Sequence, residues 1–235
     1  MPGAYFYLAS LSHVAEEFLL DEAASRHIVQ VLRMQDGEHL ILTDGRGLRA
    51  KASILDAHKK RCRVRLSERK FQKSDANRVT IALSLLKNTN RFEWFLEKAT
   101  ELGISEIIPL KCSRTEKQQF RMDRMQSIME SALIQSQQSW LPVLQEPVHF
   151  LEFVENVVSD QKFIAHCGSG EKRQLSGMID ISLSSQLILV GPEGDFTDEE
   201  INRAFRSGFI AVHLGEHRLR SETAAVAAAS LLKLI

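Results

Sequence analysis

Short apolar runs alternate along most of the chain with segments whose apolar residues recur every three or four positions. The runs at residues 79–86, 162–166 and 187–190 are typical of strands that are buried on both faces. Residues 91–102 have the spacing of an amphipathic helix, and Gly103 follows at the position where helices often end. Strands that alternate with helices in this way predict an α/β domain built on a parallel sheet.

The last fifth of the chain contains two loops with glycine residues, each of which follows a predicted strand. The strand at 187–190 runs into Gly-Pro-Glu-Gly, and the strand at 209–214 runs into a second loop that leads to an alanine-rich helix at 223–234. Between them, Thr197 and Glu200 have the spacing of a capping box, which predicts a helix from Asp198 to about Gly208. We expect the two strands to be neighbours in the sheet. Their loops would then lie side by side at the carboxyl edge, where open α/β sheets bind ligands.

The first 72 residues have a different pattern, in which short strand-like runs are separated by turn residues. Runs at 40–43, 50–55 and 62–66 flank the turn at 44–47, and a short helix is predicted at 25–33. Together they predict a small β-barrel. The polar stretch at 71–79 has the composition of a linker, so we divide the chain into domains at 1–72 and 73–235.

Composition places the chain among globular proteins, with 44% hydrophobic and 26% charged residues. It lacks an apolar run near the roughly 18 residues of a membrane span, and it does not begin like a signal peptide, so we expect a cytoplasmic protein without membrane contact. Cys62, Cys112 and Cys167 are widely spaced and odd in number, which fits neither a disulfide framework nor a zinc site. We therefore expect no metal.

Charge is balanced overall, with 30 basic and 30 acidic residues, but it is unevenly distributed. Residues 46–73 contain eleven lysines and arginines and only two acidic residues. Such a segment is either a surface that attracts phosphate groups or simply a solvated strand face.

The two loops near the C-terminus resemble a known family. Gly-Pro-Glu-Gly-Asp-Phe at 191–196, followed by Leu-Gly-Glu-His-Arg-Leu-Arg-Ser-Glu-Thr-Ala at 214–224, is similar to the pattern of RsmE proteins. These are bacterial 16S ribosomal RNA (uracil-N3) methyltransferases of the SPOUT class. Further similarity at residues 27–33, 87–103 and 109–114 extends the resemblance over the whole chain.

The resemblance implies a SPOUT α/β domain with a C-terminal trefoil knot, preceded by a PUA-like β-barrel that helps to grip RNA. It also implies an S-adenosylmethionine cofactor, a homodimer, and a substrate that is uridine 1498 of 16S rRNA in the small ribosomal subunit. Methyl transfer from a sulfonium needs orientation of donor and acceptor rather than a metal. Because N3 lies on the Watson–Crick edge, the target uridine must be unpaired or flipped.

Site residues follow from the matching positions. Arg220 is expected to stabilise the negative charge of the deprotonated uracil, and Glu222 is either the base that accepts the proton or the residue that holds Arg220. The residues expected to bind the cofactor are His166, Gly191, Glu193, Gly194, Leu214, Gly215, Leu219 and Ser221. The residues expected to bind RNA are Arg33, Lys87, Arg114 and Arg218. For His166 a hydrogen-bonded core histidine is the alternative, and Arg218 alternatively faces the partner subunit.

Two stretches depart from the family pattern, one at 132–138, where the Glu, the Gly and the Arg of the family are not matched, and one at the loop after residue 190. Gln138 stands where the family usually has an arginine, so no RNA or catalytic role of that arginine is carried over. Asp195 stands where the family has a glycine, which places a negative charge beside the cofactor loop.

Two other functions remain open from the sequence. A SPOUT enzyme acting on another RNA would keep the cofactor loops but is disfavoured by the family-like N-terminal domain. A binding module without catalysis would bind RNA but would show no saturable cofactor site. The loops at 191–194 would then be ordinary tight turns, since short motifs often match by chance.

Overall fold

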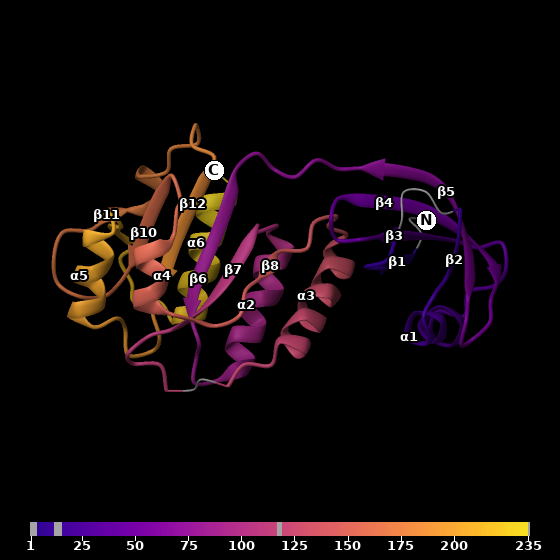
Figure 1. The fold of residues 1–235 in the computed structure, drawn as a ribbon, viewed down its shortest axis with the longest axis horizontal. Helices are drawn as coiled ribbons and strands as arrows, with labels where there is room; N and C mark the ends of the chain where they lie inside the picture. The colour runs from indigo at the N-terminus through magenta and orange to yellow at the C-terminus, as the bar shows by residue number, and fades with distance from the viewer. Residues whose placement is uncertain (1–3, 12–15, 117–118, 235) are drawn as a thin grey trace. The chain divides into compact units, whose positions relative to one another are not determined.

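The computed structural model describes residues 4–11, 16–116 and 119–234, and these form two compact units (Figure 1). The N-terminal unit comprises the described residues up to Ser74 together with Leu133–Leu141. The C-terminal unit comprises Asp75–Ala132 and the chain from Pro142 onward. Leu133–Leu141 was not predicted to join the first unit, whereas the division of the sequence after residue 72 stays a prediction.

A five-stranded sheet forms the N-terminal unit. Its strands are β1 (Ala4–Tyr7), β2 (Glu17–Leu19), β3 (His39–Thr43), β4 (Leu48–Asp56) and β5 (Arg63–Phe71), in the order β1-β3-β4-β5-β2. β1 and β3 are parallel, and the other pairs are antiparallel. Side chains alternate along β4, so that Ala50, Ala52 and Ile54 are buried in an apolar core.

The helix predicted at residues 25–33 is divided. A short α1 (Glu22–Arg26) continues into the π-helical turn η1 (His27–Val31). Asp21 caps α1 by accepting a hydrogen bond from the Ala24 backbone. Arg33, a predicted RNA contact, follows in the left-handed region with φ of 57°.

Leu133–Leu141 completes the N-terminal unit through hydrogen bonds to its turns and strand ends. Tyr5 Oη donates to the carbonyl of Gln138, over 2.8 Å, and Trp140 Nε1 donates to the carbonyl of Gln72, over 2.9 Å. The amide of Gly47 donates to the Ser139 carbonyl, also over 2.8 Å. The position at which the family arginine is replaced by Gln138 therefore belongs to this unit.

The C-terminal unit is an α/β domain whose sheet is parallel throughout. The strand order is β11-β13-β10-β12-β6-β7-β8, and β9 also pairs with β7. The strands are β6 (Arg78–Ser84), β7 (Glu106–Lys111), β8 (Val143–Leu144), β9 (Val148–His149), β10 (Gln161–Ala165), β11 (Arg173–Gln174), β12 (Ser185–Val190) and β13 (Ile210–His213). The helices are α2 (Thr89–Glu101), α3 (Met122–Ser136, of which the residues from Leu133 belong to the N-terminal unit), α4 (Phe150–Asn156), the 3₁₀ turn η2 (Leu175–Gly177), α5 (Asp198–Arg206) and α6 (Ser221–Leu234).

Helices cover both faces of the central strands. α4 and α5 pack together over one face, where Phe150 and Ala204 share a core with Leu187 and Leu189. α6 contacts β6 and β12 on the other face and packs against α2 (Figure 1). Its alanines permit this close approach, because Ala225, Ala228 and Ala229 are fully buried.

The predicted neighbour relation of the strands at 187–190 and 209–214 is wrong. β10 lies between β12 and β13 and pairs with both. Only that pairing is corrected: β10 contributes the loop that begins at His166, so three loops lie at this edge of the sheet. The threading of the C-terminus into a knot stays a prediction.

Candidate functional site

A hollow of about 670 Å³ opens where β10, β12 and β13 end. Its volume is within the range of small-molecule sites in proteins. It is lined by residues of all three loops, of the first turn of α6, and of α2: Arg91, Ala165, His166, Cys167, Lys172, Val190, Gly191, Pro192, Glu193, Asp195, Val212, His213, Leu214, Gly215, Glu216, His217, Arg218, Leu219, Arg220, Ser221 and Ala224.

Most of the predicted cofactor residues lie in this hollow. Those that line it are His166, Gly191, Glu193, Leu214, Gly215, Leu219 and Ser221, together with the predicted catalytic Arg220 and the predicted RNA contact Arg218. Gly194 and Glu222 do not line it. Lys87 and Arg114 lie outside it in the same unit, and Arg33 belongs to the N-terminal unit.

The loop after β12 is held by residues that were predicted to bind RNA. Arg114 Nη1 donates to the carbonyl of Gly194, over 2.7 Å, and more weakly to that of Phe196, over 3.3 Å. The backbone amide of Lys87 donates to the Glu193 carboxylate, over 3.1 Å, while the Lys87 ammonium pairs with Glu116. Arg114 therefore acts in this structure as a support of the loop.

The two glycines of this loop differ in how closely other atoms approach them. A Cβ at Gly191 would lie 3.2 Å from the ring of Phe196 and 3.3 Å from its backbone nitrogen. A Cβ at Gly194 would meet only the aliphatic part of the Arg114 side chain, at 3.3 Å. The requirement for glycine is thus stricter at 191, because a ring and a backbone yield less readily than a long side chain.

Asp195 connects the loop after β12 to the loop after β10. Its backbone is left-handed, with φ of 64°, a conformation that aspartate tolerates better than most residues. One carboxylate oxygen accepts from the Cys167 amide, over 2.8 Å, and the other accepts from the Phe196 amide, over 2.9 Å. The residue that departs from the family pattern therefore joins two walls of the hollow.

His166 presents an imidazole without a hydrogen-bond partner. Both ring nitrogens are buried, and neither bonds to any residue in the described part of the chain. Burial, and to a smaller extent the charge of Lys172, lowers the pKa of His166, which keeps the ring neutral at pH 7. The ring is thus not a hydrogen-bonded core histidine here, and one donor and one acceptor remain for a polar ligand.

The beginning of α6 supplies the charged side of the site. Arg220 and Ser221 line the hollow, whereas Glu222 is only 7% exposed. Glu222 Oε1 lies 3.6 Å from Nε of Arg91, and its other oxygen is buried with no hydrogen-bond partner among the described residues. Arg91, from the first turn of α2, was not predicted as a site residue, although the Lys-x-x-x-Arg-x-Glu similarity at 87–93 contains it.

In the part of the chain that the structure describes, no group of three or more His, Cys, Asp and Glu side chains is arranged to hold a metal ion. None of the helices there has the length and apolarity needed to cross a bilayer.

Comparisons with known proteins agree with this architecture. Residues 73–233 match a family described as RNA methyltransferase domain, and residues 20–67 match one described as RNA methyltransferase PUA domain. The chain is 32% identical to the ribosomal RNA small subunit methyltransferase E of Synechocystis sp. over 94% of this chain and 74% of that protein. Its Bacillus subtilis counterpart is 27% identical over 93% of this chain and 90% of that protein.

A solved structure shows the same fold. The ribosomal RNA small subunit methyltransferase E from Neisseria gonorrhoeae, bound to S-adenosyl methionine, matches with a TM-score of 0.89 and 28% identity, over 99% of this chain and 97% of that one. A PUA domain followed by this α/β domain defines the class of protein as an RNA methyltransferase. The chain belongs to the RsmE family, which confirms the resemblance found in the sequence.

Proposed function

We propose that this protein transfers a methyl group from S-adenosylmethionine to N3 of one uridine, number 1498, in 16S rRNA of the small ribosomal subunit. The observation that carries the proposal is the hollow in which both family-like loops and Arg220 come together. The relatives named above support the ribosomal substrate, since they are named as small subunit rRNA methyltransferases.

The residues of the hollow suit the cofactor. Its size accommodates a ligand of this kind, and His166, whose two buried ring nitrogens have no partner among the described residues, is one of the residues that line it. Leu214, Gly215 and Leu219 would provide apolar and main-chain contacts, as the sequence predicts. When bound, S-adenosylmethionine supplies an electrophilic methyl group on a positively charged sulfur.

The chain's own contribution to the chemistry is to orient the acceptor and to lower its affinity for a proton. Uracil N3 becomes a good nucleophile only after its proton leaves, and the resulting charge spreads over N3 and the flanking carbonyl oxygens. Arg220 lines the hollow and would stabilise that anion as a fixed donor. Ser221 is the first residue of α6, so the positive end of the helix dipole also faces this side of the site.

The role of Glu222 is better explained as support than as a base. Its carboxylate is buried and does not line the hollow, so it has no contact surface for the uracil proton. A general base must come within hydrogen-bond distance of the proton that it removes. We therefore propose that Glu222 is a positioning residue.

RNA binding would use cations in both units. β4 and β5 carry six of the eleven basic residues of the 46–73 segment, and Arg63 and Arg65 are exposed on β5. The remaining proposed RNA contacts are also exposed, namely Arg33, Lys87, Arg114 and Arg218. A homodimer that acts on the ribosomal small subunit in the cytoplasm completes the proposal.

Methylation of purified small subunits tests the function. Subunits from a strain that lacks this gene would be incubated with the protein and labelled donor, and the product would be mapped by nuclease digestion and mass spectrometry. We expect one methyl group at N3 of one uridine. Methylation of another nucleotide or of transfer RNA would refute the proposed target, and failure to bind S-adenosylmethionine in calorimetry would refute the enzymatic proposal.

An arginine substitution tests the proposed chemistry. Arg220→Ala should lower turnover by about 10²-fold or more and change the donor Kd little, because the guanidinium acts on the acceptor. Arg203→Ala is the control, since Arg203 pairs with Glu155 on the surface and does not line the hollow. Full turnover by Arg220→Ala would show that its assigned role is wrong.

A further inference from the structure

Arg91 and Glu222 form a charged pair, and the proposed chemistry gives Arg91 no role. Arg91 lines the hollow with a side chain that is 35% exposed, whereas the Glu222 side chain is 9% exposed. The carboxylate therefore reaches the hollow only through the arginine. The pair is long, at 3.6 Å, and Arg91 has no other side-chain polar partner among the described residues.

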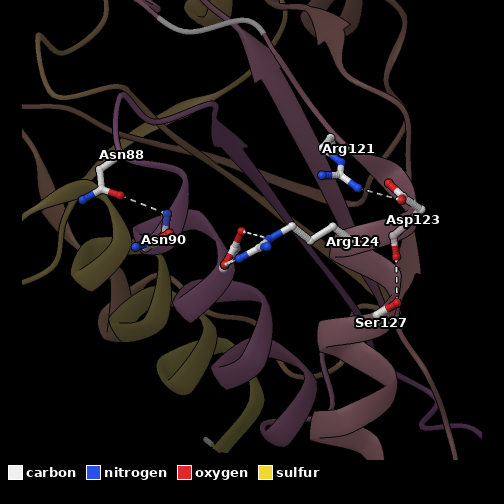
Figure 2. Close-up of polar contacts among 7 residues, drawn as sticks. Asn88, Asn90, Arg121, Asp123, Arg124 and Ser127 are labelled. Atoms are coloured by element: carbon white, nitrogen blue, oxygen red, sulfur yellow. Dashed lines mark hydrogen bonds and ion pairs between the residues drawn. The ribbon is translucent and has the colours of Figure 1, made fainter.

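Local structure alone does not account for a cation at this position. Asn88 caps α2 by accepting a hydrogen bond from the amide of Asn90 (Figure 2), and the amide of Arg91 donates to the Asn88 carbonyl. Arg91 thus lies in the first turn, where the helix dipole disfavours a positive charge. Glu222 occupies the first turn of α6, where the dipole favours a negative charge, and α2 packs against α6. The carboxylate offsets the unfavourable location of the arginine.

A buried carboxylate with one unsatisfied oxygen is costly unless a counterion is close. Glu222 meets this requirement with one guanidinium edge, at Nε. A guanidinium carries five N–H donors, and only the one at Nε faces Glu222 at 3.6 Å, while Arg91 itself lines the hollow. Glu222 holds the arginine while leaving most of its donors for a ligand.

We propose that Arg91 is a second anion-binding residue of the acceptor site and that Glu222 positions its guanidinium. This inference rests on the proposed function, because it assigns Arg91 to the deprotonated uracil. In that step the N3 proton passes to water, and the N3 lone pair forms the new bond to the methyl carbon. The sulfur–carbon bond breaks and leaves its electron pair on sulfur. Arg91 and Arg220 would both stabilise the negative charge on the ring before and during this displacement.

Single-turnover methylation of small subunits, measured beside the donor Kd and the melting temperature, tests the assignment. We expect Arg91→Gln to slow the rate by about 10²-fold and to change the donor Kd by less than about threefold. Arg91→Lys keeps the charge but loses the fork of donors, so it should recover part of the lost rate. Glu222→Gln keeps the shape of the side chain and should slow the rate by about tenfold.

The double variant separates positioning from independent action. If Glu222 acts through Arg91, then Arg91→Gln combined with Glu222→Gln should be no slower than Arg91→Gln alone, within about twofold. Rate losses that multiply would show that Glu222 has a role of its own and would overturn the positioning part of the proposal.

A matched control exists in a second arginine–carboxylate pair, which joins α3 to α2. Arg124 makes two hydrogen bonds to Glu93 of α2, at 2.5 and 2.9 Å (Figure 2), but it does not line the hollow. Arg124→Gln removes an arginine–carboxylate pair from α2 and should leave the single-turnover rate and the donor Kd unchanged. A loss equal to that of Arg91→Gln would mean that the rate responds merely to the stability of α2.

The remaining outcomes are also decisive. An unchanged rate in Arg91→Gln, or a donor Kd weakened as much as the rate, would overturn the assignment to the acceptor. If Arg91→Gln does not fold, an Arg91→Lys variant that folds and is as slow as Arg220→Ala would overturn it as well, because retained charge should help. Failure of the wild-type protein to methylate N3 would refute the proposed function instead, so the two failures are distinguishable.

Discussion

Replacement of Asp195 by glycine tests how the hollow is held together. The substitution restores the residue that the family usually has, yet it removes the two hydrogen bonds that the carboxylate accepts from Cys167 and Phe196. Each such bond contributes about 1 kcal/mol at a half-exposed position. Glycine would offset about 1 kcal/mol of this loss, because it adopts a φ of 64° without backbone strain.

The net effect is that the conformation of the two loops that binds the donor is destabilised by about 1 kcal/mol. Binding of S-adenosylmethionine should therefore be about fivefold weaker. Calorimetry would measure the donor Kd, and amide hydrogen exchange would report on the loops. The amides of Cys167 and Phe196 should exchange faster in Asp195→Gly, since both lose their acceptor. The melting temperature should fall by no more than about 4 °C, because a loss of about 1 kcal/mol is small against the entropy of unfolding of a chain of this size.

Asp195→Asn is the matched control. Asparagine tolerates the left-handed backbone and keeps one acceptor oxygen, so we expect only about twofold weaker binding. If Asp195→Gly bound the donor as tightly as the wild type or more tightly, with unchanged exchange, the connection between the two loops would contribute nothing. If Asp195→Asn lost as much affinity as Asp195→Gly, the negative charge rather than the geometry would be responsible.

Three further predictions concern stability and reactivity. Gly47→Ala should destabilise the N-terminal unit by about 2–4 kcal/mol in urea unfolding, because φ is 98° and the new Cβ would lie 2.6 Å from a backbone carbonyl oxygen. Gly177→Ala, which meets no atom within 4 Å, should cost less than about 1 kcal/mol. Cys167 should react first with a thiol reagent at pH 8, and the donor should slow the reaction. Burial raises the pKa of the other two thiols to about 11 and about 12, so they stay protonated, and rapid labelling of all three cysteines would contradict this. The pKa of His166 is lower in the folded than in the unfolded chain, so the unfolded chain takes up a proton first as the pH falls through about 6.5. The contribution of neutral His166 to the free energy of unfolding is therefore present above that pH and is lost below it. His166→Gln should flatten the pH dependence of the unfolding free energy between pH 7.5 and 5.5.

Local signals made several elements predictable from the sequence. The capping box is present, with Thr197 and Glu200 bonded reciprocally at the start of α5. The alanine-rich segment forms α6 and packs closely, since small side chains permit close approach. Both cases depend on residues a few positions apart, for which sequence spacing determines the geometry.

Features that depend on distant segments were not predictable. The placement of β10 between β12 and β13 is a property of the whole sheet, and no local pattern encodes it. β1 and β2 have only four and three residues, too few for a reliable alternation of polar and apolar positions. Arg91 joined the site because α2 packs on α6, which brings it to Glu222 across 131 positions of the sequence. The bond from the Arg114 guanidinium to the Gly194 carbonyl likewise joins residues 80 positions apart, while the expected role of Arg114 in RNA binding stays a prediction.

The way in which the N-terminal unit is completed has a consequence for biosynthesis. Its sheet is finished by residue 71, yet its turns and strand ends also bond to Leu133–Leu141. Chains are made from the N-terminus at roughly 5–20 residues per second. Leu133–Leu141 is therefore synthesised several seconds after the strands of the sheet to which it bonds. During that interval the ring of Tyr5 and the turn at Gly47 lack their native partners. A fragment cut after Ser74 would be held permanently in the same half-finished condition, so expression of this unit by itself requires the later segment to be supplied.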